Sequence, residues 1–201
     1  MSRLSPEEKS TIETYDMIAS DWVSEHSSKN FWEAEITRFR ELKPTGKLLE
    51  IGSGGGRDAK LLSGLGYDYV GTDITHNLIL EARKYNPELL FTQSSIYDLP
   101  FSDGTFDSFW ASAVLLHIPK SKIDAGLQEL SRVCRQDALG FIAIKEGNDE
   151  KVEWDNRFFA YYTQNEFTQK LLSNNFNIKE SNIRMDSPGT TWLTYLTSVV
   201  K

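Results

Sequence analysis

The chain has 201 residues and a net charge of −7, and 39% of its residues are hydrophobic. These values suit one globular domain with a real core, while the acidic balance argues against a general affinity for nucleic acid. The single cysteine, Cys134, excludes an internal disulfide and a cysteine-only metal site. The N-terminus lacks the apolar core of a signal peptide and no apolar run is long enough to span a membrane, so we expect a cytoplasmic protein.

The N-terminal part of the chain is predicted to be helical. Ser5 suits an N-cap, Pro6 suits the first helical position, and two acids follow in the first turn. Helical texture continues to Trp22 and returns over 31–42. We therefore expect cap helices within 5–43, lying over the top of the sheet that follows.

Short apolar strands then alternate with helices. Strands are predicted at 47–51, 67–73, 89–93, 106–111 and 139–145, and helices at 58–65, 75–85, 121–133 and 165–172. This alternation predicts βαβ units and a parallel sheet with helices on both faces. Two late β-rich runs, 176–184 and 191–200, are joined by so few residues that they must pair antiparallel. The expected fold is α/β, a Rossmann-like seven-stranded, mostly parallel sheet with one reversed strand near the C-terminus.

A long aromatic segment, 146–162, interrupts this pattern after the fifth strand. It contains Trp154, Phe158 and Phe159, together with two tyrosines. One interpretation is an insertion or lid over the site. The other is a surface loop that covers a buried apolar patch.

A glycine-rich loop joins the first strand to its helix. Glu50 precedes three glycines in an E-x-G-x-G-x-G spacing. Glycines let the backbone approach a ligand closely, and free N–H groups at a helix start can hold an anion. The dinucleotide-binding spacing would need a glycine at the position of Arg57, and no Gly-Lys-Ser/Thr of a P-loop follows.

This spacing resembles the signature motif of the class I S-adenosylmethionine-dependent methyltransferases, because an acid, Asp73, also ends the next strand. Weaker similarity extends over residues 10 to 184 and includes 93–101, 106–119 and 157–162, as in the small-molecule, type 11-like bacterial branch. The resemblance implies one cofactor-binding domain over 1–201. It also implies S-adenosyl-L-methionine as the cofactor, S-adenosyl-L-homocysteine as the product, a small-molecule methyl acceptor and no metal.

The resemblance also assigns the cofactor-binding residues. The loop residues implied to wrap the methionine part are Glu50, Gly52, Ser53, Gly54 and Gly56. Asp73 would accept the ribose hydroxyls, although it could instead cap the next helix. Ile74 would pack on the adenine or simply belong to the core.

Ser95 stands where the family has an acid that accepts from the adenine amine. A serine hydroxyl accepts this bond without charge assistance, so backbone groups near Ile96 would share the adenine. Asp98 could compensate, but a solvent-facing turn position suits it better. Ala111, at the exit of the fourth strand, would flank the methionine end.

Three further side chains are candidates for the site. Tyr15 shares a helix face with Trp22, and it resembles the aromatic residue with which the family's first helix covers the cofactor. Arg57 would pair with the methionine carboxylate or face solvent. His117 would act as a general base towards the acceptor, or else contact the cofactor or serve the structure.

The expected function is therefore methyl transfer to a small molecule. The alternatives are an RNA or protein methyltransferase and a module that binds the cofactor without transferring methyl groups. Amino-group methylation of nucleic acid or protein is disfavoured, because Ala111-Ser112-Ala113-Val114 replaces the Asn/Asp-Pro-Pro-Tyr type of tetrapeptide. We expect neither a nucleic-acid nor a membrane partner.

Overall fold

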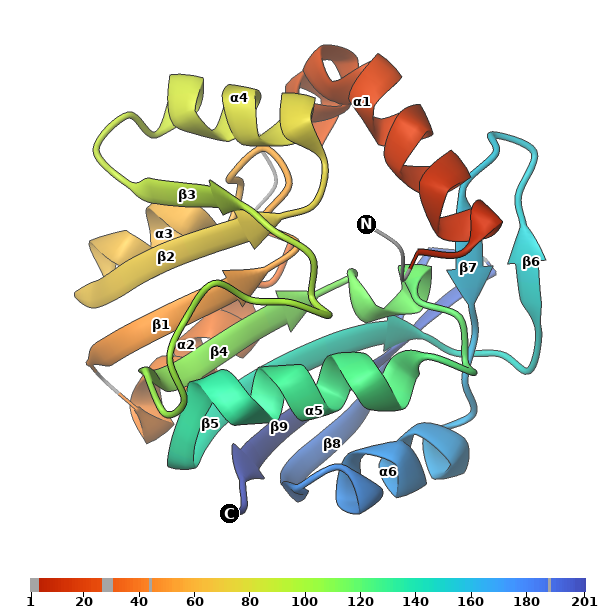
Figure 1. Ribbon diagram of the computed structural model, residues 1–201. Coiled ribbons are helices and arrows are strands. Elements are labelled where there is room, and N and C mark those ends of the chain that lie inside the picture. The colour runs from red at the N-terminus through yellow and green to blue at the C-terminus, as the bar shows by residue number, and fades with distance from the viewer. Residues whose placement is uncertain (1–3, 27–30, 44, 188) are drawn as a thin grey trace.

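A twisted sheet organises the computed structural model, which describes residues 4–26, 31–43, 45–187 and 189–201. Over these residues seven strands pair in the order β3-β2-β1-β4-β5-β9-β8 (Figure 1). Their bounds are β1 Gly46–Ile51, β2 Tyr67–Asp73, β3 Leu90–Gln93, β4 Phe106–Ser112, β5 Cys134–Lys145, β8 Phe176–Ser187 and β9 Thr190–Val199. β9 runs antiparallel to both β5 and β8, whereas the other pairs are parallel. The predicted seven-stranded sheet with one reversed strand is confirmed.

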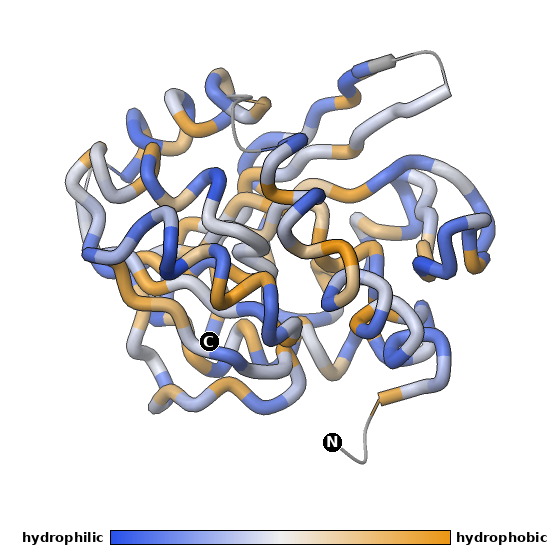
Figure 2. Tube along the Cα trace, turned by 90° about the horizontal axis from the view of Figure 1, so that it is seen from above, coloured by the Kyte–Doolittle hydropathy of each residue, from blue (hydrophilic) through white to orange (hydrophobic). Residues whose placement is uncertain are grey.

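Helices cover both faces of this sheet. Their bounds are α1 Pro6–His26, α2 Glu33–Leu42, α3 Ala59–Gly64, α4 His76–Tyr85, η1 Leu115–His117, α5 Ile123–Val133 and α6 Gln164–Ser173. Helices α5 and α6 lie in front of the sheet in Figure 1, and α2 and α3 lie behind it. Seen from above, the strands in the middle of the molecule are mostly hydrophobic (Figure 2). No helix within the described ranges is both long and apolar enough to cross a membrane.

The strand order places a ligand crevice at β1 and β4. From β1 the chain proceeds to β2 and β3 on one side and then crosses to β4 on the other. Where the strand order reverses in this way, the connections leave the carboxyl ends of the two central strands in opposite directions and open a crevice. The glycine loop and the residues after β4 both start there.

Only the first of the expected cap helices lies over this crevice. Phe39 of α2 packs edge-on against Trp110 of β4 and contacts Tyr67 of β2, so α2 is bound to a face of the sheet. Phe39 is completely buried, so burial of apolar surface holds α2 against the face of the sheet and away from the crevice. Residues 27–30 of the expected cap lie outside the described residues.

The start of β5 differs from the prediction by several residues. It begins at Cys134 rather than near residue 139, and its pairing with β4 shifts register between Phe106 and Ser108. Asp137 has a φ of 61° inside this strand. Between these two pairs β5 advances five residues and β4 only two, and this bulge hides the strand start from a simple apolar pattern.

The segment 146–162 forms a β-ribbon, in which β6 (Glu150–Val152) pairs antiparallel with β7 (Phe158–Ala160). We call residues 150–160 the ribbon. β7 is buried, and the backbone N–H of Phe158 donates to the Thr11 hydroxyl of α1 at 2.8 Å. Trp154 at the far end is 92% exposed. The ribbon has one buried strand and one exposed strand and lies beside the first turns of α1 (Figure 1).

The packing of β4 against β5 generates the first prediction. A Cβ on Gly140 would lie 2.0 Å from Cζ of the fully buried Phe109. We expect Gly140→Ala to lower the free energy of unfolding by about 1–3 kcal/mol, because the ring cannot retreat within a packed core. Gly64→Ala is the control, since a Cβ at that helical position meets nothing within 4 Å. Urea denaturation of both variants gives the comparison, and equal stabilities would contradict the packing argument.

Candidate functional site

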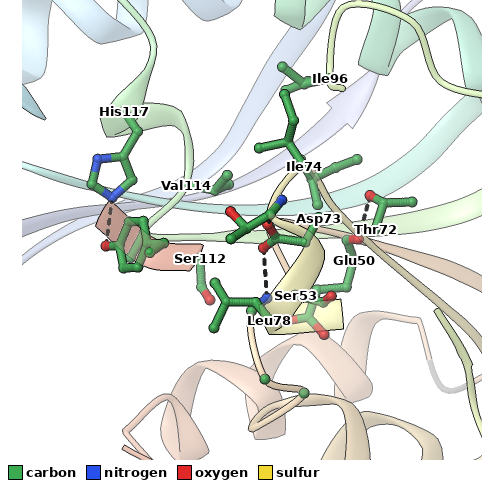
Figure 3. Close-up of a pocket in the computed structure, with 18 of the residues that line it drawn as sticks. Glu50, Ser53, Thr72, Asp73, Ile74, Leu78, Ile96, Ser112, Val114 and His117 are labelled. Atoms are coloured by element: carbon green, nitrogen blue, oxygen red, sulfur yellow. Dashed lines mark hydrogen bonds between the residues drawn. The ribbon is translucent and has the colours of Figure 1, made fainter. Parts of the chain in front are cut away.

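A cavity of about 380 Å³ opens at the carboxyl ends of β1, β2 and β4, beneath α1. Its lining includes all but one of the predicted site residues: Tyr15, Glu50, Gly52, Ser53, Gly54, Gly56, Arg57, Asp73, Ile74, Ser95, Ile96 and His117. Figure 3 shows Asp73, Ile74 and Ile96 on one side of it and His117 on the other. The exception is Ala111, which is fully buried within β4 and does not line the cavity. Ser112, Ala113 and Val114 line it instead, because only residues at the end of the strand reach the opening.

The glycine loop takes a conformation that suits glycine. Gly52, Gly54 and Gly56 all have positive φ, between 53° and 77°. A Cβ on Gly52 would also lie 2.3 Å from Cγ2 of Val114, so this turn needs glycine for its backbone angle and for space. Next to it, the Ser53 N–H donates to the Thr72 carbonyl of β2 at 2.9 Å. The loop is therefore fixed against the neighbouring strand.

Asp73 holds the loop together with the start of α4. Its Oδ2 accepts from the Gly54 N–H at 2.9 Å, and its Oδ1 accepts from the Thr75 N–H at 2.8 Å. Burial raises the pKa of Asp73, and these two backbone bonds oppose that effect. Thr75, rather than Asp73, is the N-cap of α4. Each carboxylate oxygen still has a lone pair for a further donor on the cavity side.

Two further acids, Glu50 and Asp58, lie next to the loop. Glu50 is buried and accepts from the Tyr69 hydroxyl. Burial, and then the nearby Asp58 carboxylate, raise the pKa of Glu50 well above its ordinary value. Asp58 accepts from Arg57 Nε at 2.7 Å and from Ser112 Oγ at 3.1 Å. Arg57 lines the cavity but is paired with its sequence neighbour, an ion pair that neither interpretation of Arg57 foresaw.

At the adenine end of the expected site, Ser95 caps a turn. Its Oγ accepts from the Tyr97 N–H at 3.2 Å, and Ser95 also pairs in a β-bridge with the exposed Asp98. Ile74 and Ile96 are half-buried and line the cavity. The hydroxyl of Ser95 therefore already accepts one bond, while its second lone pair and its proton remain for a ligand beside the two isoleucines.

A histidine, a tyrosine and an arginine form a hydrogen-bonded chain at the opposite end. His117 Nδ1 lies 2.7 Å from the Phe158 carbonyl and must donate to it, so Nε2 is the acceptor for the Tyr15 hydroxyl at 3.1 Å. Arg157 Nη1 donates to the same hydroxyl at 3.0 Å. Burial lowers the pKa of His117 to about 4, so the imidazole is neutral near pH 7. Tyr15 contacts Trp22 edge-on, with 5.3 Å between ring centroids, as their shared helix face predicted.

Sequence reasoning missed Glu8 and Arg157. Glu8 lines the cavity, is 5% exposed, and accepts from the Tyr97 hydroxyl at 2.6 Å and from the Lys122 ammonium at 2.9 Å. The Ser5-x-x-Glu8 spacing is that of a capping box, which indicates a helix start and not a cavity residue. Both hydrogen bonds of that box are present. Nothing in the sequence around Arg157 relates it to Tyr15, because the two meet only through the fold.

The buried charge of Glu50 leads to a prediction about stability. Because its pKa is raised in the folded protein, the folded state holds a proton that the unfolded state releases, and stability falls as the pH rises above about 4.5. We expect Glu50→Gln to raise Tm by about 2–4 °C at pH 8, since glutamine still accepts from Tyr69 without a buried charge.

Glu129→Gln is the matched control with the opposite sign. Its hydrogen bonds with Arg132 lower the pKa of Glu129, so its charge stabilises the fold above the ordinary pKa and is lost in the variant. Thermal melts at pH 5 and pH 8 compare the two variants. A Glu50→Gln protein that is less stable than wild type at pH 8 would contradict the argument.

Three comparisons with known proteins agree with this geometry. A family model described as a methyltransferase domain matches residues 49–142. The demethylmenaquinone methyltransferase of Beutenbergia cavernae is 28% identical over 71% of this chain and 60% of its own length. The 2-phytyl-1,4-naphtoquinone methyltransferase of Trichormus variabilis is also 28% identical, over 64% of this chain and 58% of its own. The chain thus spans about 60% of the length of these curated relatives.

A solved structure extends the likeness to the whole fold. The 1,6-didemethyltoxoflavin-N1-methyltransferase of Burkholderia thailandensis superposes with a TM-score of 0.81 at 16% identity. The match covers 98% of this chain and 92% of that one. That protein was crystallised with 1,6-didemethyltoxoflavin and S-adenosylhomocysteine bound.

Proposed function

We propose that the chain is a class I S-adenosylmethionine-dependent methyltransferase, which transfers a methyl group from S-adenosylmethionine to a small-molecule acceptor; the methyltransferase-domain match over residues 49–142 and the fold support this. The observation that carries this proposal is the cavity itself. It has the glycine loop and Asp73 at one side and the neutral His117–Tyr15 pair at the other.

The residues of the cavity fit the cofactor. Ser53 Oγ and Ser94 Oγ are buried, line the cavity and have no hydrogen-bond partner within the described part of the chain. Ser53 and the loop glycines would hold the methionine part, Asp73 the ribose hydroxyls, and Ile74 and Ile96 the adenine. When bound, S-adenosylmethionine supplies a methyl group that its sulfonium already makes electrophilic. The protein's contribution is then to align the acceptor and to exclude water.

The lining of the cavity favours an apolar acceptor. Leu4, Ile12, Val114 and Ile118 are among the lining residues of the cavity, and an apolar ring against them would shed water on binding. The quinone substrates named in the two curated relatives have this character. The net charge of −7 and the single cysteine support an acceptor other than nucleic acid and a reducing cytoplasm.

We propose that His117 receives a proton from the acceptor through Tyr15. The Tyr15 hydroxyl would take the proton from the acceptor atom that receives the methyl group, while its own proton passes to His117 Nε2. The low pKa of His117 keeps the imidazole neutral and ready to accept, although it makes it a weak base. We therefore expect His117 to contribute moderately to the rate of methyl transfer.

The proposed cofactor site is tested by binding. We expect S-adenosylhomocysteine to bind and to raise Tm, because it contacts only the folded protein, and NAD to have no effect. Asp73→Asn should weaken this binding by about 10- to 100-fold, because one charge-assisted acceptor for the ribose is lost. Asparagine is preferred to alanine, which would leave both the Gly54 and Thr75 N–H groups without their acceptor. Calorimetry measures both affinities, and binding of NAD without the homocysteine product would exclude the proposal.

Methyl transfer is tested with labelled cofactor and a panel of quinols, phenols and heteroaromatic amines. With any accepted substrate, we expect His117→Gln to reduce the rate by about 10- to 100-fold while the affinity for S-adenosylhomocysteine changes less than about threefold. Glutamine can still donate to the Phe158 carbonyl but offers no basic nitrogen to Tyr15. An unchanged rate would remove His117 from the reaction.

A further inference from the structure

A second cavity, of about 510 Å³, lies between the ribbon and the end of β5. We call it the ribbon cavity; Lys145, Trp154, Arg157, Phe159 and Tyr161 are among its lining residues. It shares no lining residue with the cavity beneath α1. The His117 ring lines the first cavity and lies 4.7 Å from the Phe159 ring, which lines the second. The two spaces are therefore neighbours separated by a wall of side chains.

The cations of the ribbon cavity are unequally paired. Lys151 forms an ion pair with Glu153 at 2.9 Å, and Arg157 forms one with Asp155 at 2.5 Å. Lys145 has no carboxylate within ion-pair distance among the described residues, and its ammonium lies 4.3 Å above the centre of the Phe159 ring. Burial, and then the neighbouring Arg157, lower the pKa of Lys145. A half-buried cation that rests only on aromatic faces is incompletely compensated and attracts an anion.

Aromatic side chains supply the rest of the surface. The rings of Phe159 and Tyr161 are stacked with 6.1 Å between centroids, and Trp154 adds an indole that is almost completely exposed. Large exposed aromatic rings at a cavity offer flat apolar area and favour a flat ring as the ligand.

The walls are held in place by hydrogen bonds of the main chain and side chains. The Tyr161 N–H donates to the Asp149 carbonyl at 2.8 Å, and the Tyr161 hydroxyl donates to Glu153 at 2.7 Å. A Cβ on Gly147 would lie 2.7 Å from the Cβ of Tyr161, so the glycine allows the chain to pass close to this residue. The ribbon cavity thus has fixed sides, and among its described lining residues the Lys145 ammonium and the Asp149 carboxylate are the charges without an ion pair.

We propose that the ribbon cavity binds a planar aromatic carboxylate, whose carboxylate pairs with the Lys145 ammonium and whose ring lies against Trp154 and Tyr161. Lys145 is the lining cation without an ion pair among the described residues and matches one anionic group, and the aromatic wall matches the ring. The volume lies in the range of small-molecule sites. The site is separate from the cavity of the proposed methyl transfer, because the two linings share no residue.

Binding of 2-naphthoate tests the proposal, with S-adenosylhomocysteine present to occupy the first cavity. We expect saturable binding by calorimetry below about 5 mM, and at least about tenfold weaker binding of the neutral naphthalene-2-carboxamide. Lys145→Gln should weaken naphthoate binding at least about tenfold, and Lys145→Arg should restore it to within about threefold. Trp154→Ala should weaken it severalfold through loss of ring contact.

Lys151→Gln is the matched control, since its ammonium lines the same cavity but is already paired with Glu153. We expect this variant to bind naphthoate within about threefold of wild type. Unchanged S-adenosylhomocysteine affinity in Lys145→Gln, or unchanged Tm if that ligand fails to bind, shows that the fold is intact. The proposal is overturned if naphthoate does not bind, if the carboxamide binds equally well, or if Lys145→Gln binds like wild type.

Discussion

The architecture of the cavity beneath α1 depends on the carboxylate of Asp73. A buried charge needs polar partners, and here they are the N–H groups of Gly54 and Thr75, which belong to two different connections. One side chain therefore fixes the glycine loop relative to the start of α4. Asp73 also lines the cavity, so the side chain that fixes the loop is the one proposed to accept from the ribose hydroxyls. Glu50 behind the loop adds a second buried acid, which shows that this region favours ligand binding at some expense of stability.

Polar contacts help to hold α1 over the cavity, beside an apolar cluster of Ala19 and Val23 with Leu78 of α4. Glu8 joins it to Tyr97 and Lys122, Tyr15 joins it to His117, and the Asp16 carboxylate accepts from the Asn77 N–H of α4 at 2.8 Å. Hydrogen bonds of this kind contribute about 1 kcal/mol each and exchange readily with water. A helix held in this way can separate from the sheet at a moderate cost, which a ligand enclosed beneath it requires for entry and release.

The sequence was informative where function and local backbone geometry coincide. The glycine loop follows the end of β1, and Asp73 stands at the end of β2. Because these two strands are parallel neighbours, the sheet alone brings the loop and the acid close together. Contacts between distant segments could not be predicted in this way. The Arg157–Tyr15 bond joins residues 142 positions apart and depends on where the ribbon packs. The predicted strand ended at Ala111, one residue before the observed end of β4 at Ser112, because the apolar pattern alone does not show where the strand ends.

Arg157 links a residue of the cavity beneath α1 to the ribbon cavity. Its guanidinium donates to Tyr15 on one side and pairs with Asp155 in the ribbon cavity on the other. Together with Lys145 it also lowers the pKa of His117, an effect that Asp155 opposes. An anion bound at Lys145 would reduce the positive potential at the imidazole and move its pKa back towards the ordinary value. His117, a weak base in the empty protein, would become a stronger base when the ribbon cavity holds an anion. Burial remains the main cause of the low pKa of His117, and the charges that line the ribbon cavity adjust it.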